Sequence, residues 1–166
     1  MKWATLLFAA MMFLSPTWAE DWSFGPFSIQ WADGYKKAPE GSGIQYTNVE
    51  GITVIVDNFI HKPMNKDEEA EAIQNWVHFA QTALPGLAAR QGQITRPLAK
   101  EELPQGGTLY SVASDGLDPS DPQFGLFFLD ISSKGNITQF TVEGTGLQKD
   151  HWDGFRGFFQ TAKWTD

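Results

Sequence analysis

Residues Phe124–Ile131 spell F-G-L-F-F-L-D-I, and apolar side chains fall on both faces of this segment when it is extended. A strand buried on both faces is apolar throughout, whereas a half-buried strand alternates between apolar and polar residues. We therefore predict a central strand here. A Gly-containing turn over residues 132–136 and an apolar return over Ile137–Glu143 complete a predicted hairpin.

Three further strands are predicted in the N-terminal third of the chain. Residues 27–31 alternate apolar and polar side chains, with an inward face made of Phe27, Ile29 and Trp31. Residues 44–49 and 51–60 predict two more strands, the second of them central because it is apolar on both faces. The aromatic segment 22–27 and the Gly- and Pro-containing segment 32–43 are expected to form loops.

A long helix is predicted to begin after Asn65. Glu68 lies three residues after this N-cap residue and completes a capping box. Apolar residues then recur at helical spacing, namely Ala70, Ile73, Val77, Ala80 and Leu84. Pro85-Gly86 is expected to end or kink the helix, with one further turn over residues 87–90.

The segment after the helix predicts two strands and two loops. Residues 93–98 form a weak strand pattern, and Pro97 confines it to an edge or an end of the sheet. Residues 100–107 are expected to be a polar loop, and residues 108–114 a strand. The Asp- and Pro-rich segment 115–122 predicts a second loop.

A final helix is predicted near the C-terminus, with Asp150 as its cap and an apolar stripe of Trp152, Phe155 and Phe159. Gly154 and Gly157 weaken it intrinsically, so its stability must come from packing on the sheet. The order of strands, helix, strands and helix, joined mainly by hairpins, predicts an α+β domain. Its sheet should be largely antiparallel, with helices packed on it.

This layout resembles the PsbP-like family over about residues 27–164. The similarity rests on the segments G-I-T-V-I-V-D, D-E-E-A-E-A, F-G-L-F-F-L-D-I and W-D-G-F-R-G-F-F, in this order along the chain. The resemblance implies an α/β/α sandwich. It also implies a mostly non-catalytic role in binding proteins or small ligands, with some bacterial relatives acting in secretion or at the envelope. It transfers no catalytic residue.

The first nineteen residues have the layout of a secretory signal peptide. Met1-Lys2 gives a positive start, Trp3–Leu14 is an uncharged apolar run, and small residues end at Ala19. The run is too short to span a bilayer, which takes about 20 apolar residues. We predict a signal peptide over 1–19 and one globular domain over 20–166, periplasmic or secreted and without a stable membrane anchor after cleavage. An uncleaved anchor or a buried N-terminal helix is the alternative.

Composition narrows the possible partners and chemistry. The chain has no Cys, so disulfides, thiol nucleophiles and thiolate metal sites are excluded. Its formal charge is −8, and loss of Lys2 with the signal peptide would leave −9. An acidic surface repels phosphate backbones, which argues against nucleic acid as a partner. A basic protein partner is compatible with this charge.

The acidic start of the long helix is the candidate partner surface. It comprises Asp67, Glu68, Glu69 and Glu71. Negative charge at this position also stabilises the helix dipole, which is the simpler explanation of these residues. We assign no catalytic, cofactor-binding or metal-ligating residue from the sequence.

Weaker candidates for chemistry remain open. His61, His78 and His151 each suit a structural role, although a Ser-His-Asp set assembled by folding would not be visible in the sequence. His151 and Asp153, with His61, form a weak metal candidate. Calcium in principle suits the oxygen-rich loop containing Asp115, Asp118 and Asp121, but Asx-type turns explain it more simply.

Two small motifs have structural explanations. Ser42 lies between two glycines, which is typical of a flexible loop. Asn136-Ile137-Thr138 matches a glycosylation sequon, but Asn136 is equally a turn residue.

The sequence thus predicts an exported, non-catalytic binding protein. One version is a periplasmic immunity protein that occludes a toxin delivered to the envelope; another is an envelope-accessory protein. A periplasmic carrier of a small molecule or lipid and a small secreted hydrolase are the alternatives.

Overall fold

The structure is a computed structural model that describes residues 19–38 and 44–165. The predicted signal peptide up to residue 18 and Ser42 lie outside these ranges. The described elements are β1 Ala19–Phe24, β2 Phe27–Ala32, β3 Lys36–Lys37, β4 Ile44–Thr47, β5 Thr53–Ile60, α1 Lys66–Gln91, β6 Gln93–Glu102, β7 Thr108–Asp115, β8 Gln123–Ile131, β9 Ile137–Thr145, α2 Gln148–Phe159 and β10 Lys163–Trp164.

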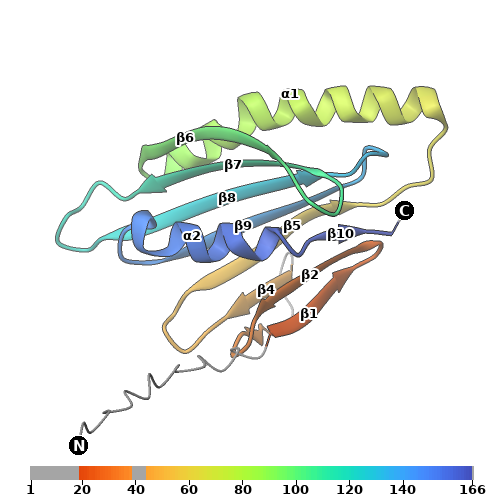
Figure 1. Ribbon diagram of the computed structural model, residues 1–166. Helices are drawn as coiled ribbons and strands as arrows, with labels where there is room; N and C mark the ends of the chain where they lie inside the picture. Colours follow the sequence, from red (N-terminus) through yellow and green to blue (C-terminus); the bar gives the residue numbers. More distant parts are fainter. Residues whose placement is uncertain (1–18, 39–43, 166) are drawn as a thin grey trace, which may run out of the picture.

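A seven-stranded antiparallel sheet forms the centre of the fold, with the order β3-β4-β5-β9-β8-β7-β6 (Figure 1). The predicted hairpin is confirmed as β8 and β9, and β8 lies inside the sheet between β9 and β7. The two helices pack on opposite faces of this sheet. The expected α+β class, with helices on a largely antiparallel sheet, is therefore confirmed.

A second, three-stranded sheet of order β1-β2-β10 lies on the α2 side. The sequence analysis expected a loop over residues 22–27, but residues 19–24 pair with β2 in register from Ala19↔Ala32 to Phe24↔Phe27. The loop prediction was wrong because Trp22 and Phe24 alternate with polar residues and both are buried. Gly25, with φ +59°, makes the tight turn between the strands.

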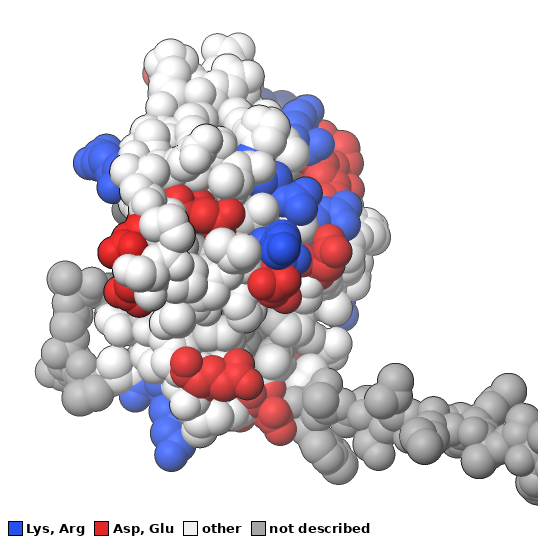
Figure 2. Space-filling view, turned by 90° about the vertical axis from the view of Figure 1, so that its left-hand side faces the viewer, with Lys and Arg blue, Asp and Glu red and all other residues white. Residues whose placement is uncertain are grey.

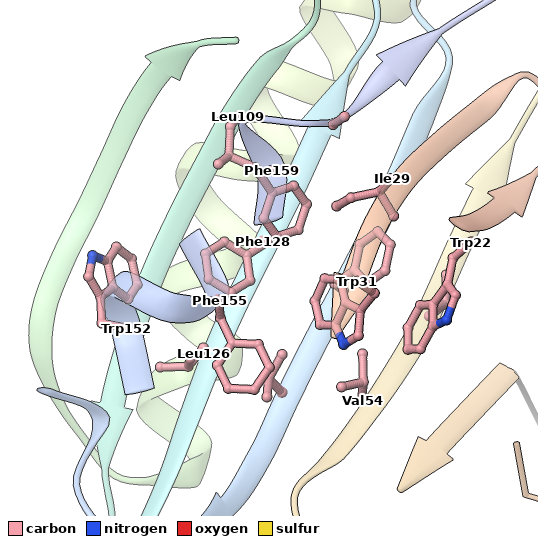
Figure 3. Close-up of a cluster of buried hydrophobic side chains, with 14 of the residues drawn as sticks. Trp22, Ile29, Trp31, Val54, Leu109, Leu126, Phe128, Trp152, Phe155 and Phe159 are labelled. Carbon is pink, nitrogen blue, oxygen red and sulfur yellow. The ribbon is translucent and has the colours of Figure 1, made fainter. Parts of the chain in front are cut away.

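The α2 face of the main sheet is sealed by aromatic side chains. Trp31 is fully buried at the centre of this cluster, with its ring stacked on Trp22 at 5.0 Å and on Phe140 at 5.5 Å. Figure 3 shows the rings of β1, β2, β8 and α2 converging between the two sheets. The predicted inward face of β2 and the predicted stripe of α2 are thereby confirmed. Large aromatic rings supply most of the buried area here.

The other face of the main sheet is covered only in part. Helix α1 packs on β6, β7 and β8, where its buried residues Ala80, Leu84 and Ala88 meet Val112 and Leu129. In the described part of the chain no helix lies on this face over β9 and β5 (Figure 1). A recess therefore runs along the end of α1 on this side.

Helix α1 begins as predicted and ends later than predicted. The Asn65 side chain accepts hydrogen bonds from Asp67 N at 3.0 Å and Glu68 N at 3.1 Å, and Glu68 Oε2 accepts one from Asn65 N. The helix continues through Pro85 to Gln91, so the expected end or kink at Pro85-Gly86 does not stop it. Leu84 and Ala88 flank Pro85 and are both buried against the sheet, which holds this part of the helix in place.

Three other expectations need correction. Lys36–Lys37 forms the short strand β3 inside the expected loop 32–43. Strand β6 extends to Glu102, so the predicted polar loop 100–107 is shorter, although the edge position implied by Pro97 is confirmed. Asp150 lies in the first turn of α2 and does not cap it; the N-cap is Leu147, which makes no side-chain cap.

Candidate functional site

A cleft of about 610 Å³ lies between edge strand β6 and helix α2. Edge-strand residues 96–101 form one wall, and Trp152, Asp153 and Arg156 of α2 form the other. The cleft exists because α2 packs by its aromatic stripe on the inner strands, while β6 extends beyond it at the edge of the sheet.

Arg96 is fixed at one end of this cleft. Its guanidinium lies 4.5 Å from the ring centroid of Trp152, a cation–π contact, and its Nε donates to Gln148 Oε1 at 3.3 Å. Trp152 and Gln148 are both buried, so the stacking surface and the acceptor are held rigidly. An arginine positioned in this way keeps further N–H groups for a ligand and loses little side-chain entropy on binding.

Arg156 occupies the other end of the cleft. It makes a two-pronged pair with Glu101, through Nε to Oε2 at 2.9 Å and Nη2 to Oε1 at 2.8 Å. Gln160 Nε2 also donates to Glu101 Oε1, at 2.9 Å. This network ties the wall formed by β6 to α2 and sets the width of the cleft.

The cleft is more positive than the chain as a whole. Its lining contains Arg96, Lys100 and Arg156 against Glu101 and Asp153, whereas the full chain has a net charge of −8. Figure 2, which faces this end of the molecule, shows several Lys and Arg side chains gathered with acidic ones on its right-hand side. Arg156 is already paired with Glu101, and Lys100 lies 3.0 Å from Glu102, so Arg96 is the cation of this lining that is best placed to attract an acidic group.

Two exposed aliphatic side chains lie in segments next to the Arg96 end of the cleft and form what we call the apolar rim: Leu117 and Leu147, which are 79% and 38% exposed. Asp115 brings their segments together, because its two carboxylate oxygens accept hydrogen bonds from Thr95 Oγ1 at 2.9 Å and Gln148 N at 2.6 Å. The rim and the cleft thus form one surface at one end of the molecule.

The acidic start of α1 lies elsewhere. Asp67, Glu68 and Glu71 are exposed and Glu69 is partly buried. Glu68 Oε2 accepts a hydrogen bond from Asn65 N, so this residue caps the helix, in agreement with a structural role for the acidic residues. A partner for this acidic surface remains a prediction.

The three histidines do not form a common site. His78 is exposed on α1 and His151 lies on α2, across the sheet, where its ring stacks on Phe124 at 4.3 Å. His61 follows β5 and lines a recess of about 250 Å³ with Lys62 and Lys134. Within the described residues the structure gives none of the three a hydrogen bond to Ser or Asp, so no hydrolytic triad is formed there.

The predicted oxygen-rich loop has local uses for its carboxylates. Asp115 holds Thr95 and Gln148 as described, Asp118 accepts from Ser120 N and Oγ, and Asp121 accepts from Gln123 Nε2. Over residues 19–38 and 44–165, no group of three or more His, Asp or Glu side chains is arranged to hold a metal ion. The Asx-turn explanation is thus favoured over calcium.

The sequon residue Asn136 is a turn residue in the structure. It is 2% exposed, and its Oδ1 accepts a hydrogen bond from Lys62 N at 3.1 Å. Its side chain is therefore unavailable to a glycosyltransferase in the folded protein.

The sequence analysis missed Arg96, Trp152 and Arg156 as a group. Trp152 was predicted as a core residue, which is correct, but its ring face also contacts Arg96, which lies 56 positions earlier in the sequence. The available signal was a pair of arginines, one on a predicted edge strand and one on the closing helix. No spacing rule joins two elements so far apart in sequence.

Comparison with known proteins places this geometry in a known fold. The solution structure of cyanobacterial PsbP (CyanoP) from Synechocystis sp. PCC 6803 is 14% identical, with the match covering 92% of this chain and 95% of that chain at a TM-score of 0.48. The crystal structure of LpqN, involved in cell envelope biogenesis of Mycobacterium tuberculosis, is 13% identical, covering 93% of this chain and 88% of that chain at a TM-score of 0.50.

The likeness to LpqN shows a shared fold, and a PsbP protein is among the similar structures, as the sequence resemblance predicted. No protein-family model matches the chain, and no curated protein matches it significantly. Neither helix in the described part of the chain combines the length and the apolar run needed to cross a bilayer.

Proposed function

We propose that this chain is an exported, non-catalytic protein of the cell envelope that binds another protein through the cleft and the apolar rim. The observation that carries the proposal is the proximity of two positioned arginines to two exposed aliphatic side chains, Leu117 and Leu147, at one end of the molecule. Arginine and aromatic residues dominate the binding energy of many protein interfaces, and exposed aliphatic groups around them exclude water.

Export rests on the predicted signal peptide over 1–19, with cleavage after Ala19. Strand β1 begins at Ala19, and its pairing with β2 runs on from Glu20↔Trp31 to Phe24↔Phe27. Cleavage there would remove one terminal residue of β1 and leave its five other pairs with β2. The envelope role reported for LpqN, which has a similar fold, supports this location.

The surface suits a partner that presents an acidic side chain flanked by apolar ones. The acidic side chain would enter the cleft toward Arg96 and Arg156, and the apolar ones would cover Leu117 and Leu147. An immunity protein that occludes a toxin in the envelope is one version of this function. In that version, Asp67, Glu68, Glu69 and Glu71 offer a second contact for basic parts of the toxin.

Site-specific photo-crosslinking in the native host tests the proposal. A photoreactive amino acid at Leu117, in the β7–β8 loop, should form a crosslink to one discrete protein. The matched control is Lys134, which is also exposed but lies in the β8–β9 turn at the other end of β8. Identical adducts from both positions, or none from Leu117, would rule out this surface as the partner site.

The immunity version has its own test. The purified protein is mixed with the product of the adjacent gene and analysed by size-exclusion chromatography. Co-elution that is lost with Arg96→Ala supports this version, whereas separate elution of the two proteins excludes that partner.

A further inference from the structure

A single acidic residue lies in the core. Asp130 of β8 is 0% exposed, and no other acidic or basic residue is buried in the described part of the chain. In the sheet register it lies between Leu109 of β7 and Thr138 of β9, on the face that the aromatic cluster seals. An ionised carboxylate in such a place is strongly unfavourable unless opposite charges or several hydrogen-bond donors surround it.

The hydrogen bonding of this carboxyl is incomplete. Its Oδ2 accepts from Trp164 Nε1 at 3.2 Å. Its Oδ1 has no donor among the described residues, and the buried Thr138 Oγ1 on the neighbouring strand has no partner there either. Gly107 lies so close to Oδ1 that a Cβ at this position would collide with it. One neutral indole N–H therefore faces the carboxyl, an environment that suits a protonated acid better than an anion.

No ion pair among the described residues compensates a charge on Asp130. The neighbours named above are uncharged, as is Phe27 of β2, whose ring lies 5.0 Å from that of Trp164. The charged residue of β10, Lys163, is exposed. Burial accordingly raises the pKa of Asp130 to about 7, against the smaller lowering by the hydrogen bond from Trp164.

The C-terminal strand β10 covers this carboxyl and is weakly held. It is two residues long, lies at the edge of the small sheet beside β2 (Figure 1), and pairs in register at Lys163 and Trp164. Thr165 adds two hydrogen bonds to Pro26 O, from its N at 2.9 Å and its Oγ1 at 3.1 Å. Terminal segments with so few contacts open at a much lower free energy than interior strands such as β8.

We propose that Asp130 and Trp164 form a pH-sensitive latch, which holds β10 over the core while the carboxyl is protonated and releases it when the carboxyl ionises. The proton passes to solvent, and release of β10 lets water reach the carboxylate while the seven-stranded sheet stays paired. The latch is separate from the cleft and does not rest on the protein-binding function.

The direction of the pH dependence follows from the two states of the latch. The pKa of Asp130 is about 7 when β10 is closed and returns toward 3.8 when it is open. Protonation therefore stabilises the closed state fully below about pH 4. This stabilisation falls as the pH rises toward 7 and is absent at higher pH.

Hydrogen–deuterium exchange of the purified protein, followed by mass spectrometry between pH 5 and pH 8, tests the latch. The exchange rate of the C-terminal peptide that contains β10 is divided by the rate in Asp130→Asn, which has nearly the same shape and cannot ionise. This ratio removes the intrinsic pH dependence of amide exchange. It should rise at least about tenfold from pH 5 to pH 7 and then level off.

Two controls make the result specific. Asp153→Asn replaces an exposed aspartate of α2 and should keep the wild-type pH dependence. At pH 8 the C-terminal peptide should be at least about tenfold less protected than a peptide from the buried part of α1, residues 80–88, because β10 opens without global unfolding. Equal protection of the two peptides would overturn the latch, as would a ratio that does not change with pH.

The wild type alone provides a second measurement should Asp130→Asn fail to fold. Its C-terminal peptide, corrected for intrinsic exchange rates, should lose at least about tenfold in protection between pH 5 and pH 7. Constant protection over this range would contradict the proposal.

Discussion

The two faces of the seven-stranded sheet are completed in different ways. Helix α2 and the small sheet β1-β2-β10 seal one face with stacked aromatic rings, and the cleft on that side lies at the edge strand β6. Helix α1 covers three strands of the other face and leaves a recess over β9 and β5. Apolar packing thus leaves a cleft at the edge of one face, while partial cover leaves a recess of mixed polar and apolar lining on the other.

The largest expected effect concerns the sealed face. Trp31→Ala removes the ring at the centre of the aromatic cluster and should reduce the free energy of unfolding by about 3–5 kcal/mol. Urea denaturation of the variant and of Val49→Ala, a residue that is 93% exposed, gives the comparison. Equal stability of the two variants would show that the rings do not seal this face.

The next effect depends on pH. Asp130 of β8 is buried on the sealed face, where its Oδ2 accepts from Trp164 Nε1 at 3.2 Å. Gly107, with φ +95°, lies so close that any Cβ there would collide with this carboxylate. Burial raises the pKa of Asp130 to about 7, against the opposing hydrogen bond from Trp164.

Because this pKa is higher in the folded than in the unfolded protein, the contribution of Asp130 to stability is complete below about pH 4 and is lost as the pH rises through 7. Asp130→Asn cannot ionise. The free energy of unfolding of Asp130→Asn minus that of the wild type should therefore be roughly 2–4 kcal/mol larger at pH 8 than at pH 5. Thermal unfolding at both pH values measures the difference; a gap that does not change with pH would contradict a buried, raised-pKa carboxyl.

A smaller effect separates two candidate caps of α2. Asp115→Ala removes the acceptor of the Gln148 N–H and should cost about 1–2 kcal/mol, whereas Asp150→Ala should cost less than about 0.5 kcal/mol. Denaturant midpoints of the two variants decide between a cap from a distant loop and one from within the helix. A larger loss with Asp150→Ala would restore the cap predicted from the sequence.

The smallest effect concerns the Glu101–Arg156 pair that closes the cleft. Both side chains are partly exposed, at 28% and 43%, so a double-mutant cycle with Glu101→Gln and Arg156→Met should give a coupling of about 1 kcal/mol or less. A coupling well above this would make the pair a stabilising element of the fold. A coupling of the predicted size would mean that the pair positions the walls of the cleft and contributes little to the stability of the fold.

Most of the fold was predictable because its strongest signals are local. Period-two alternation located β2, and an apolar run with a turn located the β8–β9 hairpin. The capping box located the start of α1. Strand β1 was missed because only two of its residues, Trp22 and Phe24, are apolar and buried, which is too short an alternation to stand out from a loop. The polar end of β6 was missed because an edge strand need not bury its side chains.

The candidate site was hardly predictable, for a different reason. Asp115 was considered as part of an oxygen-rich loop, but its role comes from Gln148, 33 residues away. Arg96 and Trp152 meet only because an edge strand and a closing helix pack together. Such contacts depend on tertiary packing and leave no periodic pattern in one sequence.

The most direct test of the cleft uses the protein that crosslinks at Leu117. Once that protein is purified, its affinity for this chain is measured by calorimetric titration. Arg96→Ala should weaken binding by at least about tenfold, because it removes a positioned guanidinium from the centre of the interface, while the exposed control Lys134→Glu should bind like the wild type. Equal affinity of folded Arg96→Ala and wild type would contradict the assignment of this cleft as the partner-binding site.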